Sequence, residues 1–209
     1  MSETKHDGHL GSVYDAKSRE EIAALYDGWA DGYEGEMARA GYRHPTICLA
    51  LLGRHLPRGA RPVLDAGAGT GILGEWLAIA GYPEVEALDL SEGMLAIAAR
   101  KGVYTQLHRL ELGAALPFAD GAFAGIVAAG VFTTGHVGSE GLDELVRICR
   151  PGGVIVLTVK TTLWTGGFAD HVAALAPGIT IAEQTAPYVS MPGETATVPS
   201  LAAVLRKSP

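Results

Sequence analysis

From residue 61 onward, short apolar runs alternate with segments in which apolar residues recur at helical spacing. The apolar runs predict strands at residues 61–65, 85–88, 107–112, 123–129, 154–159, 179–185 and 200–205. The segments between them predict helices at residues 72–80, 91–101, 142–149 and 168–175. Because strands and helices alternate at this spacing, we expect a mostly parallel sheet covered by helices on both faces.

The segment before the first strand has a helical pattern instead. Residues 1–17 are polar and contain glycine, and we expect them to form a mobile end. Ser18 and Glu21 form a capping box at the start of a helix whose apolar face carries several aromatic residues. A second short helix is expected at residues 33–40 and a third at residues 46–56, directly after a proline.

The chain has 209 residues, which suits one domain, divided here into an N-terminal helical cap (1–60) and an α/β body (61–209). No secretory signal occurs at the start, and no apolar run reaches the length of a membrane span, so we expect a cytoplasmic protein without a membrane partner. A net charge of −7 without a basic stripe disfavours nucleic acid as a partner. Cys48 and Cys149 form neither a metal motif nor a disulfide framework, and the sequence leaves the oligomeric state open.

The clearest chemical signal is the run Asp-Ala-Gly-Ala-Gly-Thr-Gly at residues 65–71, between a predicted strand and a predicted helix. Open α/β sheets bind ligands at such turns, where glycines let the backbone approach the ligand. Two interpretations are open. Gly69, Gly71 and Gly74 fit a dinucleotide-binding pattern, with Asp89 about 20 residues further on, which indicates a nicotinamide-dependent oxidoreductase. Asp65 favours the second interpretation, a protein that binds S-adenosylmethionine. Its carboxylate repels a pyrophosphate but attracts the ammonium and sulfonium groups of S-adenosylmethionine.

Asp89 is expected to bind a ribose under both interpretations. It ends the second predicted strand, where its carboxylate can accept hydrogen bonds from both ribose hydroxyls. Because both ligands contain adenosine, this residue does not discriminate between them.

Four motifs follow one another along residues 61–160: Asp65-x-Gly-x-Gly-x-Gly71, Glu86-Ala-Leu-Asp89-Leu-Ser91, Leu116-Pro-Phe-Ala-Asp120-Gly-Ala-Phe123 and Arg150-Pro-Gly-Gly153. In this order they resemble the motifs of class I S-adenosylmethionine-dependent methyltransferases. A looser similarity, to the methyltransferase-like group named for the Williams–Beuren region, is carried by Tyr26-x-x-Trp29-x-x-x-Tyr33, Gly41-Tyr42 and Val131–Val137. The sequence departs from the family at Ala124, where an aspartate often follows the Leu-Pro-Phe motif.

This resemblance implies a Rossmann-like sheet of seven mostly parallel strands, the last one antiparallel, with helices on both faces and an N-terminal helical lid. It also implies S-adenosylmethionine as the cofactor and no metal. The residues that it places around the cofactor are Asp65, Ala66, Gly67, Gly69, Gly71, Asp89, Leu90, Met94, Glu111, Leu112, Gly130, Tyr26 and Tyr33.

The expected reaction is in-line transfer of the methyl group to a small molecule, for which alignment of donor and acceptor supplies most of the acceleration. His136, in the loop after the fourth predicted strand, is a candidate general base because histidine titrates near neutral pH. Tyr33, on the aromatic helix, is a second candidate catalytic residue. Two alternatives stay open: the nicotinamide-dependent oxidoreductase, and an S-adenosylmethionine-binding protein with chemistry other than methyl transfer.

Overall fold

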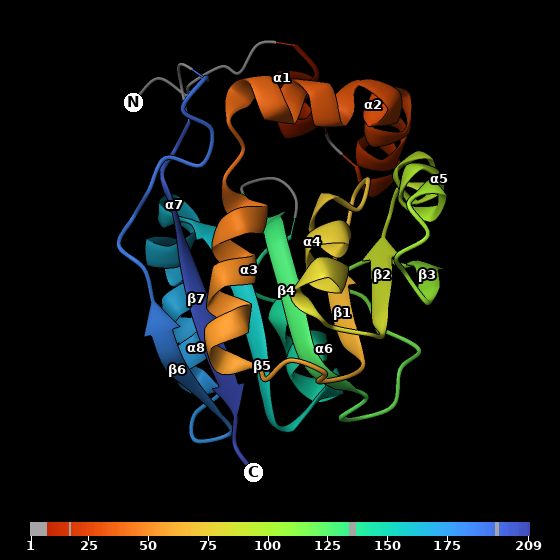
Figure 1. Cartoon of the computed structure of the whole chain (residues 1–209). Coiled ribbons are helices and arrows are strands. Elements are labelled where there is room, and N and C mark those ends of the chain that lie inside the picture. Colours follow the sequence, from red (N-terminus) through yellow and green to blue (C-terminus); the bar gives the residue numbers. More distant parts are fainter. Residues whose placement is uncertain (1–7, 17, 134–136, 195–196) are drawn as a thin grey trace.

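The computed structural model describes residues 8–16, 18–133, 137–194 and 197–209. Seven strands form one sheet in the order β3-β2-β1-β4-β5-β7-β6 (Figure 1). Neighbours from β3 to β5 are parallel, whereas β7 is antiparallel to both β5 and β6. The strands are β1 (Val63–Ala66), β2 (Val85–Asp89), β3 (Gln106–Arg109), β4 (Phe123–Phe132), β5 (Cys149–Lys160), β6 (Ile179–Gln184) and β7 (Ser200–Lys207). The expected Rossmann-like architecture is therefore confirmed.

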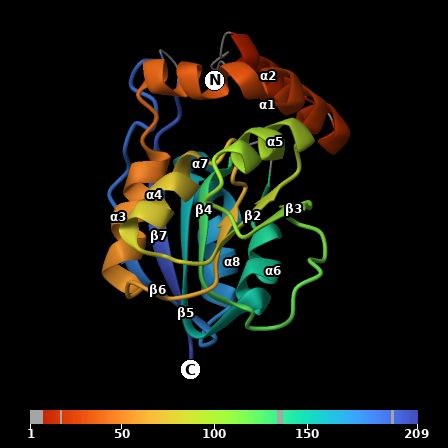
Figure 2. The same cartoon turned by 45° about the vertical axis from the view of Figure 1, so that its right-hand side comes forward.

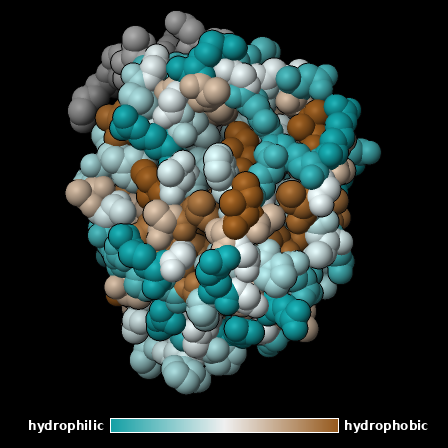
Figure 3. Space-filling model, in the orientation of Figure 1, coloured by the Kyte–Doolittle hydropathy of each residue, from teal (hydrophilic) through white to brown (hydrophobic). Residues whose placement is uncertain are grey.

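The helices cover the sheet and one of its edges (Figures 1 and 2). They are α1 (Gly8–Asp15), α2 (Arg19–Ala40), α3 (His44–His55), α4 (Ile72–Ala80), α5 (Glu92–Arg100), α6 (Gly141–Ile148), α7 (Thr161–Leu163) and α8 (Ala169–Ala174), with a π-helical turn η1 (Trp164–Phe168) before α8. On one face, α3 and α4 pack over valines of the central strands, and on the other face lie α6 and α8. Seen from the side of α3, the surface carries small apolar groups surrounded by hydrophilic residues (Figure 3).

The segment before β1 differs from the prediction in three respects. Residues 8–15 form α1, which packs on α2 through Val13, although this stretch was expected to be a mobile end. The two helices expected after Ser18 are a single helix, α2, capped by the Ser18 hydroxyl and ended by Gly41 in the left-handed conformation (φ +68°). Helix α3 belongs to the α/β body rather than to the cap, because its buried face lies on β4, β5 and β7.

The remaining N-terminal helices lie across the edge of the sheet at which the parallel strands end (Figures 1 and 2). There α2 packs against α5, and α1 packs on the outer side of α2. A small apolar cluster joins them, with Trp29 almost fully buried at its centre. The lid expected from the sequence is thus formed by α1 and α2.

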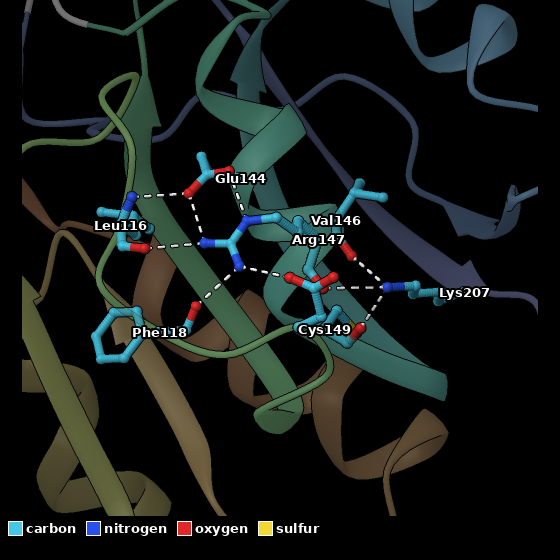
Figure 4. Close-up of polar contacts among 8 residues, drawn as sticks. Leu116, Phe118, Glu144, Val146, Arg147, Cys149 and Lys207 are labelled. Atoms are coloured by element: carbon cyan, nitrogen blue, oxygen red, sulfur yellow. Dashed lines mark hydrogen bonds and ion pairs between the residues drawn. The ribbon is translucent and has the colours of Figure 1, made fainter.

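At the opposite edge, Arg147 of α6 fixes the Leu-Pro-Phe loop that leads into β4 (Figure 4). Its guanidinium donates to the Leu116 carbonyl at 2.9 Å and to the Phe118 carbonyl at 2.8 Å, and it forms two bonds with Glu144 at 2.7 Å. Glu144 also accepts the Leu116 amide, and these bonds hold the pKa of its carboxyl at about 2. The motif therefore has a structural role on the side of the sheet away from the lid.

In the part of the chain that the structure describes, no helix is both long enough and apolar enough to cross a membrane.

Candidate functional site

A pocket lies where the strand order reverses between β1 and β4, under the lid. Ligands of open α/β sheets bind at this kind of crevice, because the loops that follow two neighbouring strands diverge there. The hollow has about 780 Å³ of free space, including the open solvent at its mouth. Its wall is formed by Arg19, Ile22, Tyr26, Tyr33, Tyr42, Gly67, Gly69, Leu88, Asp89, Leu90, Met94, Leu110, Glu111, Leu112, Ala129, Gly130, Val131 and Val137.

Ten of the residues predicted to surround the cofactor lie together on this wall. They come from the lid, the glycine loop, the end of β2, the start of α5, the segment after β3 and the end of β4: Tyr26, Tyr33, Gly67, Gly69, Asp89, Leu90, Met94, Glu111, Leu112 and Gly130. The fold therefore brings together residues that are up to 104 positions apart in the sequence, from Tyr26 to Gly130.

Asp89 is held in place by backbone donors. Its Oδ2 accepts the Gly69 amide at 2.8 Å and its Oδ1 accepts the Ser91 amide at 2.9 Å. Burial raises the pKa of this carboxyl, and the backbone hydrogen bonds oppose that shift. Since a carboxylate has about four acceptor positions, Asp89 retains acceptor capacity for a ligand hydroxyl.

Gly67 and Gly69 shape the floor of the pocket in different ways. Both have positive φ angles, +74° and +54°, which favour glycine. A Cβ at Gly67 would overlap the Val131 side chain, so this glycine allows β1 and β4 to approach each other. A Cβ at Gly69 would meet no protein atom within 4 Å and would project into open space. The loop thus leaves room for a ligand at Gly69.

Three predicted cofactor residues are not on the wall. Ala66 is buried with the core on the α6 face of the sheet. Asp65 is 1% exposed, and its Oδ2 accepts a hydrogen bond from the Tyr104 hydroxyl at 2.7 Å. Gly71, the N-cap of α4, lies against the Tyr104 ring, which a Cβ would approach to 2.9 Å. These three residues are therefore not on the pocket wall, and their contact with the cofactor stays a prediction.

The lid closes the pocket near the segment after β3. Arg19, at the start of α2, forms an ion pair with Glu111, with 2.7 Å between Nε and Oε1. It also donates to the Leu112 carbonyl at 3.1 Å. The residues expected to meet the adenine are therefore already connected to the lid in this structure.

Two further polar contacts hold α2 on the body. Asp27 accepts hydrogen bonds from the Ser91 hydroxyl and, at 2.8 Å, from the Gly93 amide at the start of α5. These bonds, the first above all, lower the pKa of the Asp27 carboxyl. Directly after α5, its C-cap residue Lys101 pairs with Glu34 of the lid at 2.8 Å. The ribose-side acid and the lid are thus linked through Ser91, which bonds to both Asp89 and Asp27.

The end of β4 forms the opposite wall. Gly130 has φ +80°, its amide donates to the Thr158 hydroxyl at 2.8 Å, and a Cβ there would overlap the Tyr42 hydroxyl. Behind Tyr42 lies His44, whose Nδ1 is 2.7 Å from the Tyr188 hydroxyl and whose pKa burial lowers to about 3. The candidate base His136 lies outside the described residues.

Several wall residues were not predicted from the sequence. Arg19 and Ile22 belong to the first turns of α2, and their helical spacing with Tyr26 is a signal that they share its face. Tyr42 follows the helix-ending Gly41, and no periodicity marks it. Trp29 is 2% exposed and packs against Tyr33, with ring centroids 4.9 Å apart, so it supports the wall from behind.

The described residues contain no cluster of three or more side chains suited to hold a metal ion. The groups on the pocket wall instead suit an adenosyl ligand. They are a carboxylate whose oxygens are held by the backbone, an open position at a glycine, and apolar or aromatic side chains. The residues present therefore fit S-adenosylmethionine.

Comparisons with known proteins point to methyltransferases. Residues 63–153 match a family model described as a methyltransferase domain. Methyltransferase-like protein 27 of Homo sapiens is 32% identical over 140 residues, which are 66% of this chain and 57% of that protein. The chain thus spans less than two thirds of the length of that relative.

Solved structures share the fold at low identity. The cyclase SpnF has a TM-score of 0.67 at 16% identity, covering 92% of this chain and 97% of the other. The 1,6-didemethyltoxoflavin-N1-methyltransferase of Burkholderia thailandensis, solved with 1,6-didemethyltoxoflavin and S-adenosylhomocysteine, has a TM-score of 0.65 at 20% identity, covering 93% and 92%.

Residues 63–153 are thus similar to methyltransferase domains, in agreement with the resemblance carried by the four ordered motifs. The dinucleotide pattern at Gly69 and Gly74 has another cause, because a Cβ at Gly74 would overlap the Tyr104 ring.

Proposed function

We propose that this protein transfers the methyl group of S-adenosylmethionine to a small-molecule acceptor in the pocket under α2. The observation that carries the proposal is the aromatic helix α2, which covers part of the site. The lid supplies Tyr26 and Tyr33 to the pocket wall, so the acceptor has to fit between an aromatic helix and the end of β4. A polymer with an extended backbone is poorly suited to such a site.

Charge supports the same acceptor class. The net charge of −7 opposes the approach of nucleic acid, which binds to clustered lysines and arginines. The methyltransferase from Burkholderia thailandensis, with a similar fold, was solved with a small heterocyclic compound.

The sulfonium of the bound cofactor supplies an activated methyl group, and the protein has mainly to align it. Asp89 would hold the ribose, Gly69 would admit the ligand to the loop, and Met94 would pack beneath the adenine. Glu111 and Leu112 would lie at the adenine edge. Holding the reacting atoms about 3–3.5 Å apart contributes up to roughly 7–11 kcal/mol in favourable cases.

A general base is required only where the acceptor atom carries a proton, and His136 and Tyr33 are the proposed residues. The Tyr33 side chain lines the pocket. General-base assistance is typically worth about 10²–10⁴-fold in rate. In His136→Ala, turnover is then expected to fall by that factor at unchanged cofactor affinity, whereas a change of a few-fold would mean that alignment alone suffices.

The proposal is tested in two stages. Calorimetry is expected to detect binding of S-adenosylhomocysteine and no binding of NADH. Asp89→Ala should weaken the binding of S-adenosylhomocysteine by about 1.5–3 kcal/mol through loss of charge-assisted hydrogen bonds. Labelled methyl transfer is then compared between a pool of small metabolites and bulk tRNA or DNA. Faster transfer to the polymers would contradict the small-molecule acceptor. Cofactor binding without transfer to either would favour an S-adenosylmethionine-binding protein with other chemistry.

A further inference from the structure

Tyr104 contacts both ends of the glycine loop. It lies in the segment between α5 and β3, and its hydroxyl donates to Asp65 Oδ2 at 2.7 Å. Its ring lies against the start of α4, where a Cβ at Gly71 would come within 2.9 Å and one at Gly74 would overlap it. The ring therefore occupies the space that side chains at these two positions would need.

The loop residues that reach the pocket, Gly67 and Gly69, lie between these two points of attachment. Asp65 fixes the loop where β1 ends, and Gly71 fixes it where α4 begins. From this geometry we propose that Tyr104 is a positioning residue for the cofactor loop. It holds an ionised Asp65 carboxylate beneath the loop, and that charge favours the positively charged cofactor over the neutral product S-adenosylhomocysteine.

The surroundings of Asp65 make its charge sensitive to pH near neutrality. Burial raises the pKa of Asp65 to about 7, the Tyr104 hydrogen bond opposes this shift, and Asp89 adds to it. Burial also raises the pKa of Tyr104 and of Cys48, the group that faces Asp65 from α3, so both stay protonated. Among Asp65, Tyr104 and Cys48, Asp65 is thus the group that gains its charge as pH rises through about 7.

The ligand pair isolates that charge. S-adenosylmethionine and S-adenosylhomocysteine share the amino acid and adenosine groups. The sulfonium lowers the pKa of the amine in S-adenosylmethionine alone, so the Asp65→Asn variant serves as the reference for titration of the ligands themselves. The two ligands differ by the methyl group and by the permanent positive charge of the sulfonium. The ratio of their affinities therefore depends on the charge beneath the loop. A change that weakens the binding of both ligands equally leaves this ratio unaltered.

The experiment is calorimetry of both ligands on the full chain between pH 5.5 and 9. In the wild type, the preference for S-adenosylmethionine should rise by about threefold or more across pH 7, the sign expected for a buried negative charge near a cation. Tyr104→Phe removes the hydroxyl but keeps the ring, so the pKa of Asp65 should rise and the transition should move to higher pH. Asp65→Asn should give a low ratio that lacks the rise across pH 7.

Tyr82→Phe is the matched control. Tyr82 is a buried tyrosine in the same core layer, and its hydroxyl donates to the Leu56 carbonyl at 2.9 Å, away from the loop. This variant should keep the wild-type pH profile. A flat ratio in the wild type, a normal rise in Asp65→Asn, or identical profiles for Tyr104→Phe and Tyr82→Phe would each overturn the proposal. Because only binding is measured, these outcomes are independent of the acceptor and of methyl transfer.

Discussion

At the scale of single residues, glycines that look equivalent in the sequence serve different purposes. Gly67 lets Val131 approach, Gly69 leaves space for a ligand, and Gly71 and Gly74 make room for Tyr104. The pattern of spaced glycines is thus the sum of several packing requirements, and only one of them concerns the pocket directly.

This distinction predicts the effect of a single methyl group. Gly69→Ala and Gly59→Ala both place alanine at a positive φ (+54° and +80°) where a Cβ meets no atom within 4 Å. Both should therefore lower the free energy of unfolding by about 1–2 kcal/mol, the cost of a left-handed conformation. Only Gly69→Ala should also weaken S-adenosylhomocysteine binding, by about tenfold or more, because its methyl group enters the pocket. Denaturant titration and calorimetry measure the two effects separately, and equal binding by both variants would refute this assignment.

The residue scale also shows what the sequence can predict. Asp89 and Gly69 were predicted correctly to border the pocket, because a residue that ends a strand and a loop glycine have few other places to lie. The direction of the Asp65 side chain was not predictable from the sequence. All four residues of Val63–Ala66 are buried, so no alternation of apolar and polar residues shows which face of the sheet each side chain lies on. Tyr104 was missed because it lies in an irregular segment 39 positions from its partner.

At the scale of elements, the lid is one long helix that the sequence presents as two. Gly28, Gly32 and Gly35 lower its intrinsic helix propensity, and the pattern is accordingly weak in the middle. Tertiary contacts with α1 and α5 compensate, and those with α5 depend on residues far away in the sequence. The seven strands and the helices α4, α5, α6 and α8 were predictable because each has its own start and stop signals.

The contact between α2 and α5 predicts how the lid is held. Asp27→Ala removes the acceptor for Ser91 and Gly93, so amide exchange in α2 should become faster and cofactor affinity should fall several-fold. Asp31→Ala is the control, because Asp31 is an exposed aspartate one turn further along the same helix. If both variants exchange equally, Asp27 does not hold the lid.

The same contact has a defined pH dependence. The folded pKa of Asp27 is below its ordinary value, so its contribution is complete above about pH 4 and is lost as pH falls through the lower, folded value. Wild-type exchange in α2, corrected for the intrinsic rate, should therefore be constant from pH 5 to 8 and increase only in acid. An increase near neutrality would point to another titrating group.

At the scale of the whole molecule, one corner joins segments that are far apart in the sequence (Figure 4). Arg147 binds the loop at Leu116 and Phe118, and Lys207 of β7 donates to the Val146 and Cys149 carbonyls at 2.8 and 2.7 Å. Loop, helix and last strand thus meet around the end of α6.

Loss of this corner should affect stability but not the pocket. Arg147→Ala removes the donors to two loop carbonyls, so it should lower the melting temperature clearly more than Arg150→Ala, a change at an exposed neighbour. Calorimetry should show unchanged S-adenosylhomocysteine affinity for both variants at a temperature where they are folded. Equal melting temperatures would mean that the loop is held by apolar packing alone.

The position of β7 has a consequence for how the chain folds. This strand follows all the others in the sequence, yet it lies between β5 and β6. Until residues 200–207 have been synthesised, β5 has one open edge and β6 has no partner strand. Open edges are prone to pair with other chains. Productive folding of the sheet therefore waits for the last strand, and ribosome-bound chains stopped before residue 200 should be aggregation-prone and protease-sensitive.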